Sequence, residues 1–171
     1  QAKQVSVAGW LAMTNKRHEM TKDKDGYWRV TVSGIPAAYH YHEYFVDGTC
    51  VVNPQAPVGY GAHKVVNFFD MPGEEDFYTL KDVPHGTLRV EHFYSSVTGR
   101  TRDCWIYTPP GYDEEMEKEY PVLYLQHGGG ENETGWVWQG KVNYIMDNLI
   151  AENKCRPMII VMNCLYCVNH Q

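Results

Sequence analysis

The chain has 171 residues, 43% of them hydrophobic, and a formal net charge of −6 at pH 7. This is the composition of an ordinary globular protein, sufficient for one medium domain or two small ones. No cluster of lysine and arginine is present to neutralise phosphates, and no apolar run approaches the ~20 residues that a membrane span needs, so neither nucleic acid nor membrane is an expected partner. The chain begins with Gln1 rather than Met, as it would after removal of a targeting segment or trimming of a longer chain.

Residues 1–80 are predicted to form a first unit of short strands, separated by turn signals such as Asp47-Gly48 and Asn53-Pro54. The expected strands lie around Val5 and Val7 and over residues 27–32, 39–46 and 49–52. Trp28 shares one face with Val30 and Val32 and is therefore expected in the core. Residues 59–80 are rich in turn signals and irregular, which indicates a connector. Short strands at near-regular spacing favour a β-sandwich.

The second unit is predicted over residues 85–171. Strands at 87–94 and 102–108 are expected to pair antiparallel across a turn at 95–99, and a third strand is expected at 120–126. Apolar residues recur at near-helical spacing between 143 and 152, which predicts one crossover helix there. The continuous apolar run 158–162 is typical of a parallel strand that is covered on both faces.

The strand at 120–126 ends at the sequence His127-Gly128-Gly129-Gly130. Successive glycines allow several backbone amides to turn toward one point, because no Cβ atoms obstruct them. In lipases and esterases a glycine-rich turn of this kind supplies an N–H to the oxyanion hole. Gly129 and Gly130 are the candidates for that amide, and the alternative is a plain strand-to-loop turn. His127 is expected to hold the loop by hydrogen bonding rather than to transfer protons.

Around this turn the chain resembles carbohydrate esterase family 1, which includes feruloyl, acetyl-xylan and enterochelin esterases. The resemblance rests on four stretches in the order and spacing of the family's first half: residues 105–112, 120–136, 147–151 and 157–162. It implies the first four strands of an α/β-hydrolase sheet. It also implies that Trp136 and Gln139 line the substrate cleft, for which loop packing is the alternative reading. The parent reaction would be ester hydrolysis through an acyl-serine, with no metal or other cofactor.

Residues 1–80 resemble a second family, the immunoglobulin-like carbohydrate-binding module of family 48. The matching motifs are Gly26-x-Trp28, Tyr39-x-Tyr41, Phe45-Val46-Asp47-Gly48 and Asn53-Pro54. Glycogen-binding members place a tryptophan just after the Asp-Gly pair, whereas this chain has Thr49-Cys50. The departure favours a role beside a catalytic domain over glycogen binding. The expected sugar-stacking platform is Trp10, and the secondary candidates for sugar contact are Tyr39, Tyr41 and Tyr60.

No complete catalytic site is expected in this chain. An α/β-hydrolase needs a serine in a Gly-x-Ser-x-Gly elbow, followed by an acid and a histidine. None of the four serines lies in such a setting: Ser6, Ser33, Ser95 and Ser96. A thiol of Cys164 or Cys167 acting with His170 is a disfavoured alternative, because both cysteines lie in a short tail without the surroundings that activate a thiol. The chain is therefore expected not to hydrolyse esters by itself.

No metal site is expected either. The five cysteines are irregularly spaced, and Cys164-x-x-Cys167 has no second Cys or His pair at zinc spacing. His40 and His42 share one strand face but lack a third ligand at suitable spacing. For all of these residues a structural role, packing at strand ends and within the sheet, is favoured over metal binding.

Together these features predict an immunoglobulin-like β-sandwich followed by the first half of an α/β-hydrolase fold. The expected function is that of an amino-terminal piece of a secreted or periplasmic plant-cell-wall carbohydrate esterase, whose parent hydrolyses feruloyl or acetyl-xylan esters. Two alternatives stay open: a module that binds arabinoxylan-type polysaccharide and carries a degenerate esterase tail, and an assembly piece completed by another chain. Strand 158–162 is expected to expose an unpaired edge, which predicts a homodimer or a strand-swapped assembly.

Overall fold

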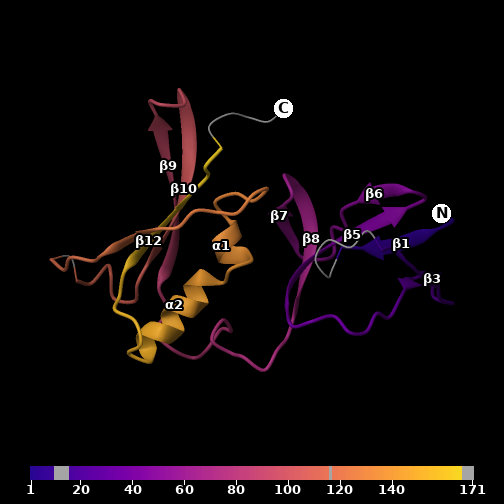
Figure 1. Cartoon of the computed structure of the whole chain (residues 1–171), viewed down its shortest axis with the longest axis horizontal. Helices are drawn as coiled ribbons and strands as arrows, with labels where there is room; N and C mark the ends of the chain where they lie inside the picture. Colours follow the sequence, from indigo (N-terminus) through magenta and orange to yellow (C-terminus); the bar gives the residue numbers. More distant parts are fainter. Residues whose placement is uncertain (10–15, 116, 167–171) are drawn as a thin grey trace. The chain divides into compact units, whose positions relative to one another are not determined.

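The structure, a computed structural model, describes residues 1–9, 16–115 and 117–166. The chain divides into two compact units, Gln1–Glu74 (unit 1) and Glu75–Gln171 (unit 2) (Figure 1). The sequence places the same division slightly later, between residues 80 and 85. Each unit has its own sheet and is described separately below.

Unit 1 is built from short β-strands. Its elements are β1 (Val5–Ala8), β2 (His18–Glu19), β3 (Thr21–Lys22), β4 (Trp28–Arg29), β5 (Ala38–Val46), β6 (Thr49–Val51), β7 (Val58–Gly61) and β8 (Lys64–Met71). The strand order is β2-β1-β5-β8-β7, with β6 also paired to β5, while β3 and β4 form a separate two-stranded ribbon. The immunoglobulin-like sandwich stays a prediction.

Strand β5 connects the two parts of the unit 1 sheet. Its first half, from Ala38 to His42, pairs antiparallel with β8, and its second half, up to Val46, pairs with β1 and β6. The buried apolar residues of unit 1 lie beside it: Val5, Val7, Ala8 and Val66. A nine-residue strand of alternating aromatic and polar residues therefore organises this unit, as the pattern in 39–46 predicts.

Two predictions for unit 1 are wrong. The first half of the expected connector 59–80 is the β7–β8 hairpin, in which Val58 pairs with Asn67 and Gly61 with Lys64. Of the expected strand 27–32, only Trp28–Arg29 is a strand, and Trp28 is half-buried rather than fully enclosed. The β7 glycines explain the first error. Gly-Tyr-Gly is typical of a turn, but glycines also occur in a strand where side chains of another strand fill the space above them.

Unit 2 contains a four-stranded sheet and two helices. Its elements are β9 (Thr87–Ser95), β10 (Arg100–Thr108), β11 (Val122–Tyr124), α1 (Gly135–Trp138), α2 (Val142–Ala151) and β12 (Ile159–Asn163). The order is β11-β12-β10-β9, with β11 and β12 parallel and the other pairs antiparallel. Figure 1 shows β9 and β10 as a long hairpin whose turn projects beyond the other strands. The predicted hairpin, crossover helix and parallel strand are confirmed.

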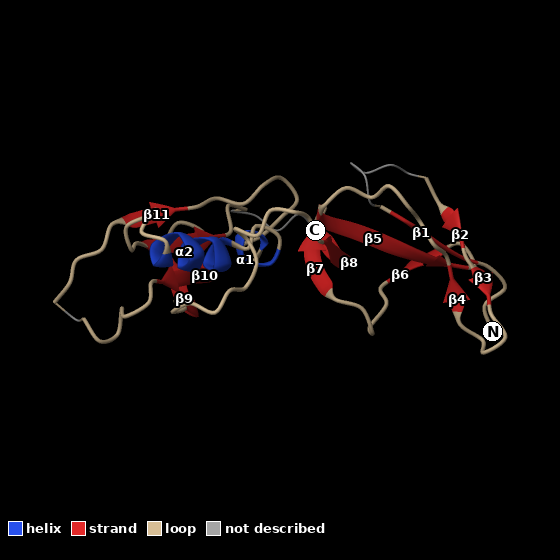
Figure 2. Cartoon of the chain, turned by 90° about the horizontal axis from the view of Figure 1, so that it is seen from below, coloured by secondary structure: helices blue, strands red, loops and turns tan. Residues whose placement is uncertain are grey.

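The core of unit 2 lies between the sheet and helix α2 (Figure 2). Tyr107 from β10 and Ile160 and Met162 from β12 are almost fully buried against Val142 and Met146 of α2. The two helix residues are four apart and so lie on one face of α2. Burial of an apolar side chain of this size stabilises the fold by about 1.5–3 kcal/mol. This packing holds β12 in the interior of the sheet.

The predicted edge strand is wrong. Strand β12 pairs with β10 on one side and with β11 on the other, so its backbone groups are used on both sides. The edge strands are β9 and β11, and the three residues of β11, Val122, Leu123 and Tyr124, are all exposed. The connection through α2 carries the chain past β11 and inserts β12 between β11 and β10. Order along the chain alone does not reveal this insertion.

Candidate functional site

The glycine loop, residues 127–130, follows β11 at the end of the sheet where β12 also finishes. The amide of Leu125 donates to the carbonyl of Val161 at 2.9 Å and so extends the pairing of the two parallel strands. The loops that follow them, 127–130 and 164–166, consequently meet at one edge. In open α/β sheets, ligands bind in the crevice outside the carboxyl ends of the strands.

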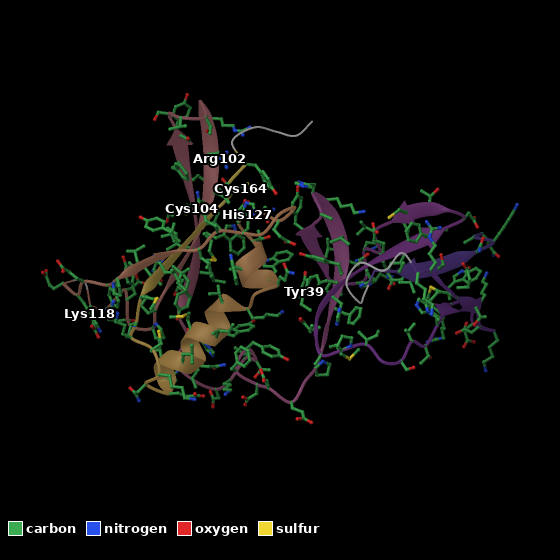
Figure 3. The ribbon with its side chains drawn as sticks, viewed as in Figure 1. Tyr39, Arg102, Cys104, Lys118, His127 and Cys164 are labelled. Atoms are coloured by element: carbon green, nitrogen blue, oxygen red, sulfur yellow. The ribbon has the colours of Figure 1, made fainter. Side chains whose placement is uncertain are left out.

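A pocket of about 400 Å³ opens at this edge. Its wall combines the glycine loop with the start of the helical region that follows: His127, Gly128, Gly129, Glu131, Gly135, Trp136, Gln139 and Gly140. Figure 3 shows His127 on the same side of the unit as Cys164 and Arg102, beyond the end of β12. The pocket gathers Gly129, Trp136 and Gln139, three of the candidates that the sequence singles out, and His127 lines it with them.

Both ring nitrogens of His127 are used by backbone groups. The amide of Leu165 donates to Nε2 at 3.0 Å, so this nitrogen carries no proton. Nδ1 lies 2.8 Å from the carbonyl of Gly128, so it carries the ring proton and donates it. The imidazole is therefore held in one neutral tautomer and joins the two loops. This geometry fits the expectation that His127 holds the loop.

The structure separates the two candidate oxyanion amides. The N–H of Gly130 donates to the hydroxyl oxygen of Tyr166 at 2.7 Å, and Gly130, with φ of 80°, does not line the pocket. Gly129 lines the pocket, and a Cβ on it would meet nothing within 4 Å. Over residues 1–9, 16–115 and 117–166, no acceptor is found for the Gly129 N–H. Gly129 is therefore the better placed of the two.

Trp136 forms an aromatic wall of the pocket. Its indole N–H donates to the carbonyl of Gln126 at 2.6 Å, which fixes the ring, while 37% of the residue stays exposed. A Cβ on Gly140 would lie 2.7 Å from the Trp136 ring, so only glycine at position 140 allows the ring this place. Gln139 is the C-terminal capping residue of α1 and also lines the pocket.

Two residues near the loop carry no signal in the sequence. Arg102 of β10 donates to the carbonyls of Tyr166 and Cys164 at 2.7 and 2.5 Å, and the Tyr166 ring lies 5.2 Å from that of His127. These contacts join positions more than 35 residues apart, so no local pattern predicts them.

Cys104, on the same strand as Arg102, is buried, and burial raises the pKa of its thiol, which disfavours a nucleophilic role.

The candidates in unit 1 only partly converge. The Tyr39 ring stacks on Phe68 with centroids 4.6 Å apart and meets the edge of Tyr41 at 5.1 Å. The Tyr41 hydroxyl donates to the carbonyl of Tyr60 at 2.9 Å, but the Tyr60 side chain alternates to the other face of β7. Trp10 lies outside the described residues.

The rings of Tyr39 and Tyr41 lie directly over the two glycines of β7. A Cβ on Gly59 would lie 2.7 Å from the Tyr39 hydroxyl, and one on Gly61 would lie 2.5 Å from the Tyr41 ring. His40 and His42 point to the opposite face and are buried. Within the described residues, no group of three or more His, Cys, Asp or Glu side chains could hold a metal ion. None of the described helices is long and apolar enough to cross a bilayer.

Comparison with known proteins places an esterase segment in unit 2. Residues 95–163 match the family model described as "Putative esterase". The chain is 40% identical over 149 residues to an endo-1,4-beta-xylanase/feruloyl esterase of Xylanibacter ruminicola, a match that covers 84% of this chain and 20% of the relative. The chain thus spans about a fifth of that relative's length.

Solved structures agree on the fold. A ferulic acid esterase from Anaeromyces mucronatus in complex with ferulic acid is 30% identical, with a TM-score of 0.51 over 57% of this chain and 36% of the esterase. An enterochelin esterase from Shigella flexneri is 13% identical, with a TM-score of 0.66 over 95% of this chain and 47% of that one. The chain therefore contains a segment, residues 95–163, that matches the esterase family, and its fold is similar to that of solved esterases of α/β-hydrolase-like fold.

Proposed function

We propose that unit 2 is the amino-terminal half of the catalytic domain of a secreted carbohydrate esterase that hydrolyses feruloyl or acetyl esters on xylan. In this proposal unit 2 contributes the glycine loop and one wall of the acyl pocket. The xylanase/feruloyl esterase relative and the ferulic acid esterase structure support the substrate class. The pocket beside Gly129 supports the site.

The observation that carries the proposal is the juxtaposition of Gly129 with the fixed ring of Trp136 around one pocket. Ester hydrolysis develops negative charge on the carbonyl oxygen, and a pre-oriented backbone N–H at about 2.7–3.1 Å stabilises it. An aromatic wall beside that amide can pack against the flat ring of a phenolic acyl group. Gly129 would therefore bind the carbonyl oxygen while Trp136 orients the acyl ring.

The chemical step needs groups that these 171 residues do not supply in a recognisable form. The sequence has four serines and none in a Gly-x-Ser-x-Gly setting. We therefore propose that the nucleophile, its base and the second oxyanion amide come from further polypeptide, and that this chain by itself binds the acyl group without cleaving the ester.

Titration of the ¹⁵N-labelled chain with ferulic acid tests the binding part of the proposal. We expect shift changes at the Gly129 amide and the Trp136 indole N–H, and their loss in Trp136→Ala. Trp138→Ala, on the same short helix but absent from the pocket lining, is the matched control and should bind as the unchanged chain does. Shift changes confined to other residues, or none at millimolar ligand, would remove the acyl-pocket assignment.

A fluorophosphonate probe tests the catalytic part. Without a serine elbow, we expect no labelled residue and no burst of product from methyl ferulate or an aryl acetate. Stoichiometric labelling of any residue of this chain would show an unrecognised nucleophile and contradict the proposed division of the site.

For unit 1 we propose a polysaccharide-binding role of the arabinoxylan type. The supporting feature is the aromatic cluster of Tyr39, Tyr41 and Phe68, which stands over glycines rather than over bulky neighbours. Retention on insoluble arabinoxylan should fall in Tyr39→Ala and in Trp10→Ala. Retention of Tyr39→Ala equal to that of the unchanged chain would exclude the aromatic cluster as a binding surface. A molar mass of two chains in solution would instead favour assembly, for which the exposed strand β11 offers one free edge.

A further inference from the structure

We infer that Arg102 is a positioning residue for the glycine loop, acting through the segment 164–166. The inference rests on the proposed function, because it concerns the same pocket. It adds to that function a residue that lies on a different strand and outside the pocket lining. It is carried by a continuous chain of hydrogen bonds from β10 to Gly130.

The first link joins Arg102 to the segment that follows β12. The guanidinium donates through Nη1 to the carbonyl of Tyr166 at 2.7 Å and through Nη2 to the carbonyl of Cys164 at 2.5 Å. Strand β12 ends at Asn163, so these carbonyls lie beyond the ladder that holds the strand. The planar fork of arginine presents two donors in fixed geometry, which suits two carbonyls separated by a single intervening residue. Arg102 thereby fixes the direction in which the chain leaves β12.

The second link joins that segment to the glycine loop. The amide of Leu165, between the two carbonyls that Arg102 binds, donates to Nε2 of His127 at 3.0 Å. The hydroxyl of Tyr166 accepts the N–H of Gly130 at 2.7 Å, and the rings of Tyr166 and His127 lie 5.2 Å apart. Three successive residues, 164 to 166, are therefore bound alternately to Arg102 and to the loop.

The consequence for the site follows from which amide is occupied. Because Tyr166 takes the Gly130 N–H, the loop turns at Gly130 and presents Gly129 to the pocket. Because Leu165 donates to Nε2, His127 keeps its proton on Nδ1 and holds the Gly128 carbonyl. Loss of Arg102 releases the segment, and with it both constraints on the loop. A displacement of about 1 Å in such a site can reduce activity ~10²-fold.

The test uses the whole 171-residue chain and reads the loop before any ligand is added. Long-range ¹H–¹⁵N correlation reports the His127 tautomer, and amide spectra report Gly129 and Gly130. In Arg102→Met we expect His127 to lose its single tautomer and both glycine amides to shift. Arg89→Met is the matched control, because Arg89 lies on the neighbouring strand and binds Asp113 instead. Its loop signals should not move.

Tyr166→Phe separates the two constraints. It removes the acceptor for the Gly130 N–H and keeps the ring beside His127 and the carbonyl that Arg102 binds. We expect faster exchange of the Gly130 amide with the His127 tautomer retained. Arg102→Lys keeps the charge but loses the fork, so it should restore the tautomer only in part. If Arg102→Met does not fold, these two milder variants carry the same test.

Ferulic acid affinity is the last readout, and about a tenfold loss is expected for Arg102→Met and Tyr166→Phe. An unchanged His127 tautomer and unchanged glycine amides in Arg102→Met would overturn the inference. Altered loop signals with unchanged ferulic acid affinity would also overturn it, because the loop would then be positioned for nothing that the pocket binds. If the unchanged chain binds no ferulic acid, the proposed function fails, while the loop signals still decide whether Arg102 positions the loop.

Discussion

Two buried titratable side chains, Asp147 in unit 2 and His42 in unit 1, differ in whether their polar atoms have hydrogen-bond partners. In unit 2, Asp147 of α2 is 2% exposed and accepts three hydrogen bonds: from the Tyr107 hydroxyl at 2.7 Å, the Gly86 amide at 2.9 Å and Nδ1 of His85 at 2.9 Å. In unit 1, His42 of β5 is 6% exposed, and within the described residues its Nδ1 has no hydrogen-bond partner. Only one of these burials is compensated.

The difference shows what a buried polar group does in each unit. Asp147 joins α2 to β10 and to the loop before β9, three segments that hydrophobic packing alone would leave free to slide. Burial and the Asp147 carboxylate raise the pKa of Tyr107, so its hydroxyl keeps its proton and donates. His42 joins nothing through Nδ1, and an unpaired buried polar group costs stability. Unit 2 should therefore depend on its buried charge, and unit 1 should not.

The largest effect is expected for Asp147→Ala. Three donors lose their acceptor, one of them the fully buried Tyr107 hydroxyl, and breaking a buried charged network costs about 3–5 kcal/mol. We expect a loss of this size in the free energy of unfolding of unit 2, measured by urea unfolding with amide exchange in β10 as the probe. Asp103→Ala is the control, because Asp103 pairs with His92 on the surface and such pairs contribute only about 0.2–1 kcal/mol. Similar losses in both variants would contradict the special role of Asp147.

Tyr107→Phe should have a smaller effect in the same direction. The variant removes one donor to a buried carboxylate and leaves those of Gly86 and His85 in place, so a loss of about 1.5–3 kcal/mol is expected. Tyr124→Phe makes the same chemical change at a residue that is 69% exposed and should leave stability unaltered. No change in stability in Tyr107→Phe would mean that the Asp147 carboxylate is satisfied without the Tyr107 hydroxyl, by its other two donors or by water.

The smallest effect, and one of opposite sign, is expected for His42→Leu in unit 1. Replacing a buried group that lacks a partner by an apolar one should leave the free energy of unfolding unchanged or raise it by up to about 1 kcal/mol. His40→Leu is the matched control on the same face, because Nε2 of His40 lies 2.8 Å from the Pro36 carbonyl. That variant should lose about 1 kcal/mol. Equal losses in both would abolish the contrast between the two units.

The pH dependence of unit 1 sharpens the same prediction. Burial lowers the pKa of His42 below its ordinary value of 6.5. As the pH falls through 6.5, His42 binds a proton in the unfolded chain but stays neutral in the folded unit, so unfolding becomes more favourable. The stability should be complete above about pH 6.5 and decline below it, until the folded pKa is reached. Amide exchange in β5 and β8 measures the free energy of unfolding at each pH. In His42→Leu this free energy should no longer change with pH in the range above that in which carboxylates titrate.

Local pattern predicted most of unit 2. The run of β-forming residues on either side of a Ser-Ser turn gives the β9–β10 hairpin, and apolar residues three and four apart give α2 over Val142–Ala151. The position of β12 was beyond such patterns, because its residues would be equally apolar at an edge or in the centre. The packing of Ile160 and Met162 beneath α2 determines that β12 lies between β10 and β11.

The residues of the candidate site also fall into two groups, those that local sequence predicts and those that only long-range contacts place. The glycine loop follows from a short motif, and Trp136 and Gln139 follow from the family resemblance of the residues around it. Arg102, Tyr166 and the choice of Gly129 over Gly130 depend on hydrogen bonds between segments far apart in the chain. An arginine in the middle of a strand and a tyrosine beyond one are ordinary in sequence and acquire a role only through their neighbours.

By itself the sequence determined the elements whose signal lies within about ten residues: the alternating strands, the amphipathic helix and the glycine turn. The tertiary structure decided which strand is interior, why Gly59 and Gly61 belong to a strand, and where Asp147 finds its three donors. The physical reason is that backbone propensity and periodicity are local, whereas space for a ring and partners for a buried charge are supplied by other segments. Those partners exist only once the chain has folded.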